Sequence, residues 1–140
     1  MQVIFPRRSG VKKSAPAPPS ATSTTKQSGS IAGIRRSPCP VACCLDIIGD
    51  RWTLLVIRDL ILGRSRFKDF TASPEGIPTN ILTERLQRLQ LHGLATRAPS
   101  PGSKHPAYQL TPKGEALVPV LRAMKDWGLT WEPGTRDGLS

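Results

Sequence analysis

Polar side chains between residues 79 and 88 have the types and spacing of a helix face that reads DNA bases. At about 100° per residue, Leu82, Leu86 and Leu89 share one side of a helix and leave the polar residues outside. Asn and Gln amides can pair with adenine through two hydrogen bonds, and a Thr methyl group can contact thymine. An ordinary solvated helix face has the same composition, so the flanking elements must decide. The predicted base contacts are Thr79, Asn80, Thr83, Gln87 and Arg88.

A second set of residues has the chemistry of phosphate binding. A hydroxyl and two cations stand at the start of a short helix, where the helix dipole favours an anion. Further basic residues decorate a hairpin, and such residues commonly lie over a neighbouring minor groove. Arg85 lies nearer the buried stripe, and for it a salt bridge with Asp59 or Asp69 competes with a base contact. The predicted phosphate and wing contacts are Ser65, Arg66, Lys68, Arg97, Lys104 and His105.

Cys39 is a candidate redox sensor. It precedes Pro40, which suits the first position of a helix, and the dipole at a helix amino end favours a thiolate. Nearby arginines, Arg35, Arg36 and Arg51, would strengthen that effect; the alternative is an unreactive thiol. Cys44 is expected to be a small core residue. The cysteine spacing lacks the paired pattern of zinc sites, so we expect no metal and no cofactor.

These candidates need a scaffold, and the apolar periodicity predicts a mainly α fold with a small β-hairpin wing. Helices are expected over residues 40–48, 52–61 and 78–92, with a short helix carrying Phe67 and Phe70. Asp50 is expected to cap the second helix. Short strands are expected at residues 94–97 and 107–110, and a last helix begins at Pro112 and bends at Pro119. This order predicts a winged helix-turn-helix.

The last predicted helix carries more apolar surface than a peripheral helix needs. Its apolar residues recur at spacings of four and three, which places them on one face. A dimer that reads two DNA half-sites requires such a surface. We therefore predict a homodimer interface on this helix, formed by Leu117, Leu121, Met124, Trp127 and Trp131.

The ends of the chain differ from its middle. Residues 1–37 are predicted to be a disordered basic tail rich in Ser and Pro, residues 38–132 the DNA-binding and dimerisation domain, and residues 133–140 a flexible C-terminus. The prolines of the tail argue against an organellar transit peptide. The net charge is +10, and seven of these charges lie in a tail without acids, on Arg7, Arg8, Lys12, Lys13, Lys26, Arg35 and Arg36.

Outside the tail the chain is only mildly basic. The prediction that the folded domain binds DNA therefore does not rest on the net charge. No apolar run reaches the roughly 18 residues that a membrane span needs. Three closely spaced cysteines do not form a secreted disulfide framework. We therefore expect a cytoplasmic protein without membrane contact.

Five segments of the chain carry recognisable motifs. They are CPV…DIIGDRWTLLVI (39–57), RFKDF (66–70), GIPTNILTERL (76–86), YQLTPKG (108–114) and LVPVL (117–121). In this order they resemble the HxlR family of winged-helix regulators. The resemblance implies cytoplasmic prokaryotic dimers that pair through the first and last helices, which adds Val41 and Leu45 to the interface. It also implies near-palindromic operators, repression more often than activation, and sensing of aldehydes, quinones or oxidants through the cysteine before Pro-Val, here Cys39.

Two other functional classes compete with a dimeric, sequence-specific regulator of double-stranded DNA. One is a winged helix used for protein contact, with loose nucleic-acid binding by the basic tail. The other is an enzyme, which we do not expect because the sequence has no nucleophile–base pairing, phosphate loop or carboxylate pair in a recognisable frame. The regulator is the preferred interpretation, with a small electrophilic effector as a candidate partner.

Overall fold

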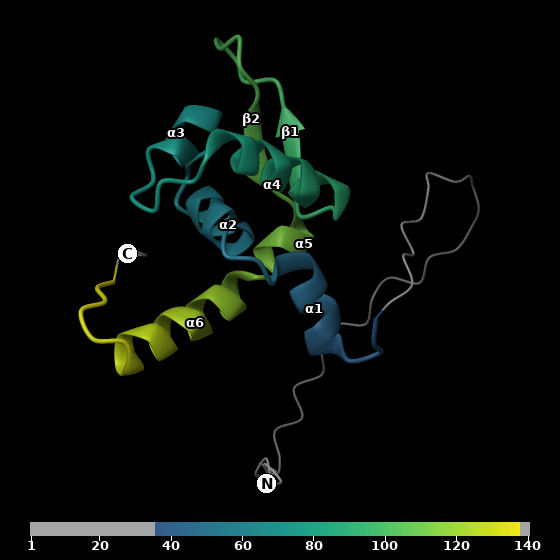
Figure 1. Ribbon diagram of the computed structural model, residues 1–140. Helices are drawn as coiled ribbons and strands as arrows, with labels where there is room; N and C mark the ends of the chain where they lie inside the picture. The colour runs from purple at the N-terminus through teal and green to yellow at the C-terminus, as the bar shows by residue number, and fades with distance from the viewer. Residues whose placement is uncertain (1–35, 138–140) are drawn as a thin grey trace, which may run out of the picture. The chain divides into compact units, whose positions relative to one another are not determined.

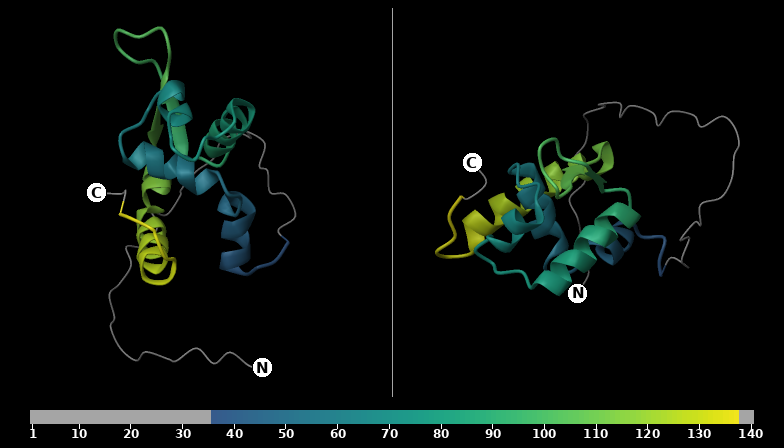
Figure 2. Two further views of the ribbon diagram at one scale, coloured as in Figure 1. Left: turned by 60° about the vertical axis from the view of Figure 1, so that its left-hand side comes forward. Right: turned by 90° about the horizontal axis from the view of Figure 1, so that it is seen from above.

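The computed structural model describes residues 36–137, which belong to the unit Ile34–Ser140. Predictions for residues 1–35 and 138–140 lie outside the described residues. Figures 1 and 2 show that α1 and α6 extend away from the hairpin. The elements are α1 (Pro40–Ile48), α2 (Thr53–Ile61), α3 (Phe67–Thr71), α4 (Thr79–Leu91), β1 (Ala95–Ala98), β2 (Ala107–Leu110), α5 (Pro112–Glu115) and α6 (Val118–Trp131). No helix within residues 36–137 is long and apolar enough to cross a membrane.

The first two helices begin where the sequence predicts. Pro40 occupies the first turn of α1, where its fixed φ is helical and its missing N–H has no helical acceptor to lose. Asp50 caps α2, because its Oδ1 accepts the backbone N–H groups of Trp52 at 2.9 Å and of Thr53 at 3.0 Å. The carboxylate thus satisfies two donors that the first turn leaves without helical partners.

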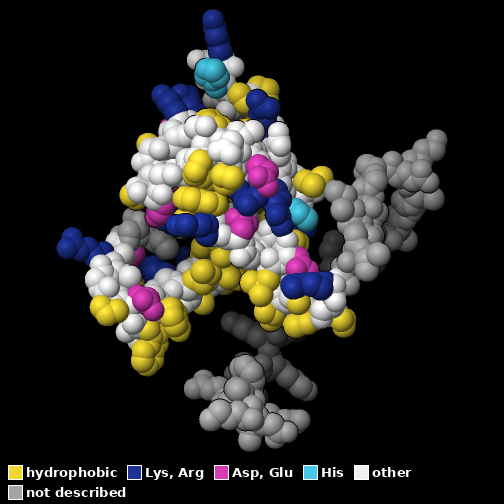
Figure 3. All heavy atoms as spheres, in the orientation of Figure 1, with side chains coloured by type: hydrophobic (Ala, Val, Ile, Leu, Met, Phe, Trp, Pro, Cys, Tyr) yellow, Lys and Arg dark blue, Asp and Glu magenta, His cyan; other side chains and the backbone are white. Residues whose placement is uncertain are grey.

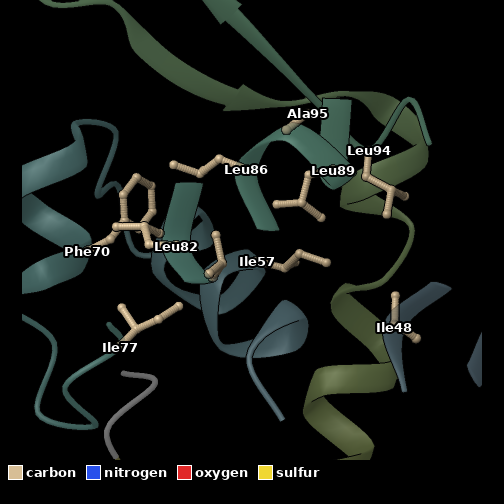
Figure 4. Close-up of a cluster of buried hydrophobic side chains, with 10 residues drawn as sticks. Ile48, Ile57, Phe70, Ile77, Leu82, Leu86, Leu89, Leu94 and Ala95 are labelled. Carbon is tan, nitrogen blue, oxygen red and sulfur yellow. The ribbon is translucent and has the colours of Figure 1, made fainter. Parts of the chain in front are cut away.

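The core forms around the inner stripe of α4. Leu82, Leu86 and Leu89 are almost completely buried, as predicted, and they pack in one cluster with Ile57 of α2 and Phe70 of α3. Figure 4 shows these five side chains gathered between the helices. Burying a side chain of this size contributes about 1.5–3 kcal/mol, so the stripe fixes which side of α4 faces outward.

The wing is a two-stranded antiparallel hairpin. Ala95 pairs with Leu110 and Ala98 with Ala107. β1 begins one residue later than predicted because Leu94 packs into the core, and its carbonyl accepts the Thr111 N–H at 3.0 Å. The predicted fold class, mainly helical with a small hairpin wing, is confirmed.

The C-terminal region differs from the single bent helix that we predicted. Thr111 does cap a helix, since its Oγ1 accepts the Gly114 N–H at 3.1 Å, but this helix, α5, ends at Glu115. A new helix, α6, then starts at Val118. Pro119 lies in its first turn, where proline is tolerated, so it begins a helix instead of bending one. No residue of α6 is buried.

Candidate nucleic-acid interface

The outer face of α4 carries the predicted base-reading residues. Thr79, Asn80, Thr83 and Gln87 are all exposed, on the side of the helix away from the leucine stripe. The Thr83 hydroxyl donates to the Thr79 carbonyl at 2.9 Å, which leaves the Thr83 oxygen as an acceptor. The face therefore offers donors and acceptors that are open to solvent, as contacts with base edges require.

Arg88, also predicted as a base contact, points away from this face and toward α1. Its guanidinium donates to the carbonyl oxygen of Asp46 in the last turn of α1, and its Nε is buried without a partner in the described part of the chain. The last carbonyls of a helix attract cations because they lack helical donors. Arg88 therefore joins α4 to α1, a role that depends on how the two helices pack.

Arg85 also faces inward, but its acidic partners are not those expected from the sequence. Its Nε donates to Asp50 Oδ1 at 2.8 Å, and its Nη1 contacts Glu84 at 2.8 Å. Asp50 thus caps α2 and holds α4 with the same oxygen. Burial favours the neutral acid, but hydrogen bonds from Thr53 and Trp52, with the charge of Arg85, lower the pKa of Asp50 below its ordinary value. The charged form therefore fixes both helices.

The amino end of α3 is occupied by a side chain of the protein itself. Asp69 Oδ2 accepts the backbone N–H groups of Ser65 at 3.3 Å and of Arg66 at 3.0 Å. Ser65 therefore does not cap this helix with its hydroxyl, and a phosphate clamp made from these amides is excluded. What remains for an anion is the pair of side chains on Arg66 and Lys68.

Basic side chains mark the same end of the molecule. Arg97, Lys104 and His105 of the wing are exposed, and the Arg97 guanidinium lies over the Tyr108 ring at 6.0 Å from its centroid. Figure 3 shows dark blue side chains over α3 and the wing, whereas yellow apolar side chains cover the far ends of α1 and α6. The wing and the start of α3 therefore both present basic side chains to solvent.

A buried ionic cluster fixes the turn between α3 and α4, and sequence reasoning missed it. Asp59 of α2 is 3% exposed, forms ion pairs with Arg58 at 2.8 Å and Arg64 at 3.1 Å, and accepts a hydrogen bond from the Ser73 hydroxyl. Arg58 also contacts Glu75 at 2.5 Å and lowers the pKa of that carboxyl to about 2. Because Ser73 and Glu75 belong to the turn, the cluster sets where α4 begins.

The described thiols are all free, and they lie on or beside α1. Cys39 is exposed, as a sensor requires, but the nearby arginines have other partners. Arg36 pairs with Asp46 at 2.8 Å, and Arg51 lies over Trp52 at 5.0 Å. Cys44 is exposed, so its assignment to the core is wrong. Arg35 lies outside the described residues.

The apolar stripe of α6 is displaced from the one predicted. Leu117 and Leu121 are half-buried and pack against the core of their own domain. Val120, Met124, Trp127 and Trp131 recur at spacings of four, three and four and are all exposed. On α1, Val41 and Leu45 are exposed as well. We call Val120, Met124, Trp127 and Trp131 the free stripe of α6.

A family model, HxlR-like helix-turn-helix, matches residues 47–135. The chain belongs to this family. The HTH-type transcriptional regulator YvaP of Bacillus subtilis is 34% identical over 88 residues, which are 62% of this chain and 82% of YvaP. Like YvaP, this HxlR-like protein is a transcriptional regulator with DNA as its partner, and it is not an enzyme.

Two solved structures of regulators share the fold. The reduced form of the transcriptional regulator YodB from B. subtilis is 34% identical, with a TM-score of 0.57 over 69% of this chain and 98% of YodB. The oxidised form of the redox regulator HypR is 32% identical, with a TM-score of 0.60 over 71% of this chain and 99% of HypR. YodB has also been solved with a bound quinone.

Proposed function

We propose that this HxlR-like protein is a sequence-specific repressor that binds a near-palindromic operator as a homodimer. The observation that carries the proposal is the outer face of α4, where Thr79, Asn80, Thr83 and Gln87 are exposed while the same helix buries three leucines. These four side chains would contact base edges in the major groove. The contacts to phosphates and the minor groove would come from Arg66, Lys68, Arg97, Lys104 and His105.

The dimer in this proposal pairs through α1 and α6. Val41, Leu45 and the free stripe of α6 are exposed apolar side chains at the end of the domain remote from the wing. A partner there would remove the stripe from water without covering α4. Two α4 helices related by a two-fold axis would read half-sites about 34–36 Å apart, one turn of the duplex. A dimer seated across a promoter would exclude other proteins, hence repression.

Deleting residues 1–37 tests whether the folded domain discriminates between DNA sequences. We expect the shortened protein to bind all DNA more weakly, because seven cations are lost, and to keep its preference for an operator selected from random duplexes. The measurement is a gel-shift comparison of operator and random duplex at physiological salt. Loss of the preference together with the tail would favour the alternative, a protein-interaction module whose tail binds nucleic acid loosely.

We also propose Cys39 as the sensor of an electrophile or oxidant. The thiolate would add to a quinone, giving a thioether and a hydroquinone ring, or two thiols would form a disulfide while diamide takes up their electrons and protons. The support is exposure of Cys39 at the start of α1, whose other end holds Arg88 of α4 through Asp46. Movement of α1 would therefore reach the DNA-reading helix.

Replacing Cys39 by Ser tests this proposal, with Cys44→Ser as the matched exposed control. We expect diamide to change the operator affinity of the wild type and of Cys44→Ser roughly tenfold, a usual size for coupling between sites. The Cys39→Ser protein should not respond. An identical response of all three proteins in the gel-shift assay would exclude Cys39.

A further inference from the structure

A cleft of about 590 Å³ lies between the start of α3 and the wing. Its volume falls within the roughly 300–1,000 Å³ of small-molecule sites and is far more than one phosphate group needs. The lining combines cations with aromatic and apolar side chains and includes no acid. The lining includes Arg66, Phe67, Lys68, Arg97, Pro106 and Tyr108.

Two contacts fix the walls of the cleft. The Tyr108 backbone N–H, in the wing, donates to the carbonyl of Ser65, just before α3, at 2.8 Å. The Tyr108 ring meets the buried Phe70 ring edge to face at 6.3 Å between centroids. The α3 wall and the wing wall are thus joined at Tyr108, and the cleft is part of the folded domain.

The charge of the cleft is not neutralised. Arg66, Lys68 and Arg97 form no ion pair among residues 36–137, whereas Arg58, Arg64 and Arg85 all do. Asp69 lies close in sequence, but its Oδ2 already accepts two backbone N–H groups. Three cations around one concave surface favour an anionic ligand.

The apolar lining residues restrict the chemical class of the ligand. Phe67 is exposed, and exposure of an aromatic ring to water is unfavourable for a monomer. Pro106 and Tyr108 line the same cleft. The stacked Arg97 and Tyr108 pair offers a cation beside a π face. A phosphate diester would pair with the cations but leave the aromatic side chains exposed to water. An aromatic acid would pair with the cations and also pack against the aromatic side chains.

We propose that the cleft binds a small planar aromatic anion, such as an aromatic carboxylate. Its acid group pairs with Arg66, Lys68 or Arg97, and its ring packs against Phe67 and Tyr108. The same cations belong to the proposed phosphate contacts, so an occupied cleft competes with DNA. This competition rests on the proposed function, whereas binding of the anion does not.

The test uses the only tyrosine of the chain as a reporter. Full-length protein labelled with 3-fluorotyrosine gives one ¹⁹F resonance, from Tyr108, and benzoate is titrated without DNA. We expect a saturable shift with benzoate, with at least roughly tenfold weaker binding of the neutral benzamide, which lacks charge-assisted hydrogen bonds. Arg66→Ala should weaken benzoate binding by a similar factor. Arg122→Ala removes an exposed cation on α6, away from this cleft and from the proposed DNA contacts, and should leave the affinity unchanged.

Three results would overturn the proposal: no saturable shift with benzoate, equal binding of benzamide, or the same shift and affinity with inorganic phosphate, which would make the cleft a phosphate site. A second titration measures how tightly the protein binds a fluorescent DNA duplex, in benzoate or in an equal concentration of chloride. Weaker DNA binding in benzoate alone supports competition, and equal binding refutes it. If the protein bound no DNA, the proposed function would fail while the ¹⁹F titration still decided the ligand.

Discussion

Replacing Asp59 by Ala is expected to lower the free energy of unfolding by about 3–5 kcal/mol, the usual cost of removing one partner from a buried ion pair. Asp59 is 3% exposed, forms ion pairs with Arg58 and Arg64, and accepts a hydrogen bond from Ser73. Without the carboxylate, two guanidinium groups lose a partner inside the domain, and the turn before α4 loses its anchor. Urea unfolding followed by circular dichroism measures the change.

Glu84→Ala is the matched control, because it also removes a carboxylate from an arginine. The Glu84 side chain is 61% exposed where it contacts Arg85, so we expect a change of less than about 1 kcal/mol. Because domains of this size have a total stability of about 5–15 kcal/mol, the two outcomes are easily separated. Equal stabilities of the two variants would contradict the role given to the cluster.

Replacing Trp127 by Glu is expected to give a folded monomer with much weaker operator binding. Trp127 is 60% exposed, so the domain does not need it for its core, but a charge in the free stripe would oppose pairing of two copies. A monomer lacks the second DNA-binding domain and so loses the affinity gained by bivalent binding, which is about 10²–10⁴-fold. Sedimentation velocity reports the mass, and a gel shift reports the affinity.

Thr130→Glu places the same charge elsewhere on α6, outside the free stripe, and serves as the control. It should remain dimeric and keep its operator affinity. A Trp127→Glu protein that sediments as a dimer, or that binds the operator as tightly as Thr130→Glu, would show that the stripe does not form the interface.

The sequence predicted most of the fold because its determinants are local. Pro40, Asp50 and Thr111 each start or cap a helix within three residues of their own position. The leucine stripe of α4 also identified the core, since only one helical register buries three leucines. The predicted bend at Pro119 is wrong because the apolar pattern does not reveal that α5 ends before this residue. Pro119 instead lies in the first turn of a new helix.

The site was less predictable, because long side chains choose partners that lie far away in the sequence. The outer face of α4 needed only helical spacing, and its exposure is as predicted. Arg88 and Arg85 instead contact Asp46 and Asp50, 42 and 35 residues away, across a helix contact that no local pattern encodes. The Asp59 cluster likewise joins residues that meet only after α2 and the turn have packed.

Base contacts by the outer face of α4 are tested by measuring operator discrimination. Single base-pair substitutions are introduced along an operator selected from random DNA, and affinities are compared for wild type and Asn80→Ala. The substituted protein should lose about 1–3 kcal/mol of discrimination at one position in each half-site, with binding to random duplex unchanged. Gln90→Ala, whose amide donates to the Leu86 carbonyl on the same helix, should keep the full pattern. An equal loss of affinity for every duplex, or unaltered discrimination between the operator variants, would show that Asn80 does not contact a base.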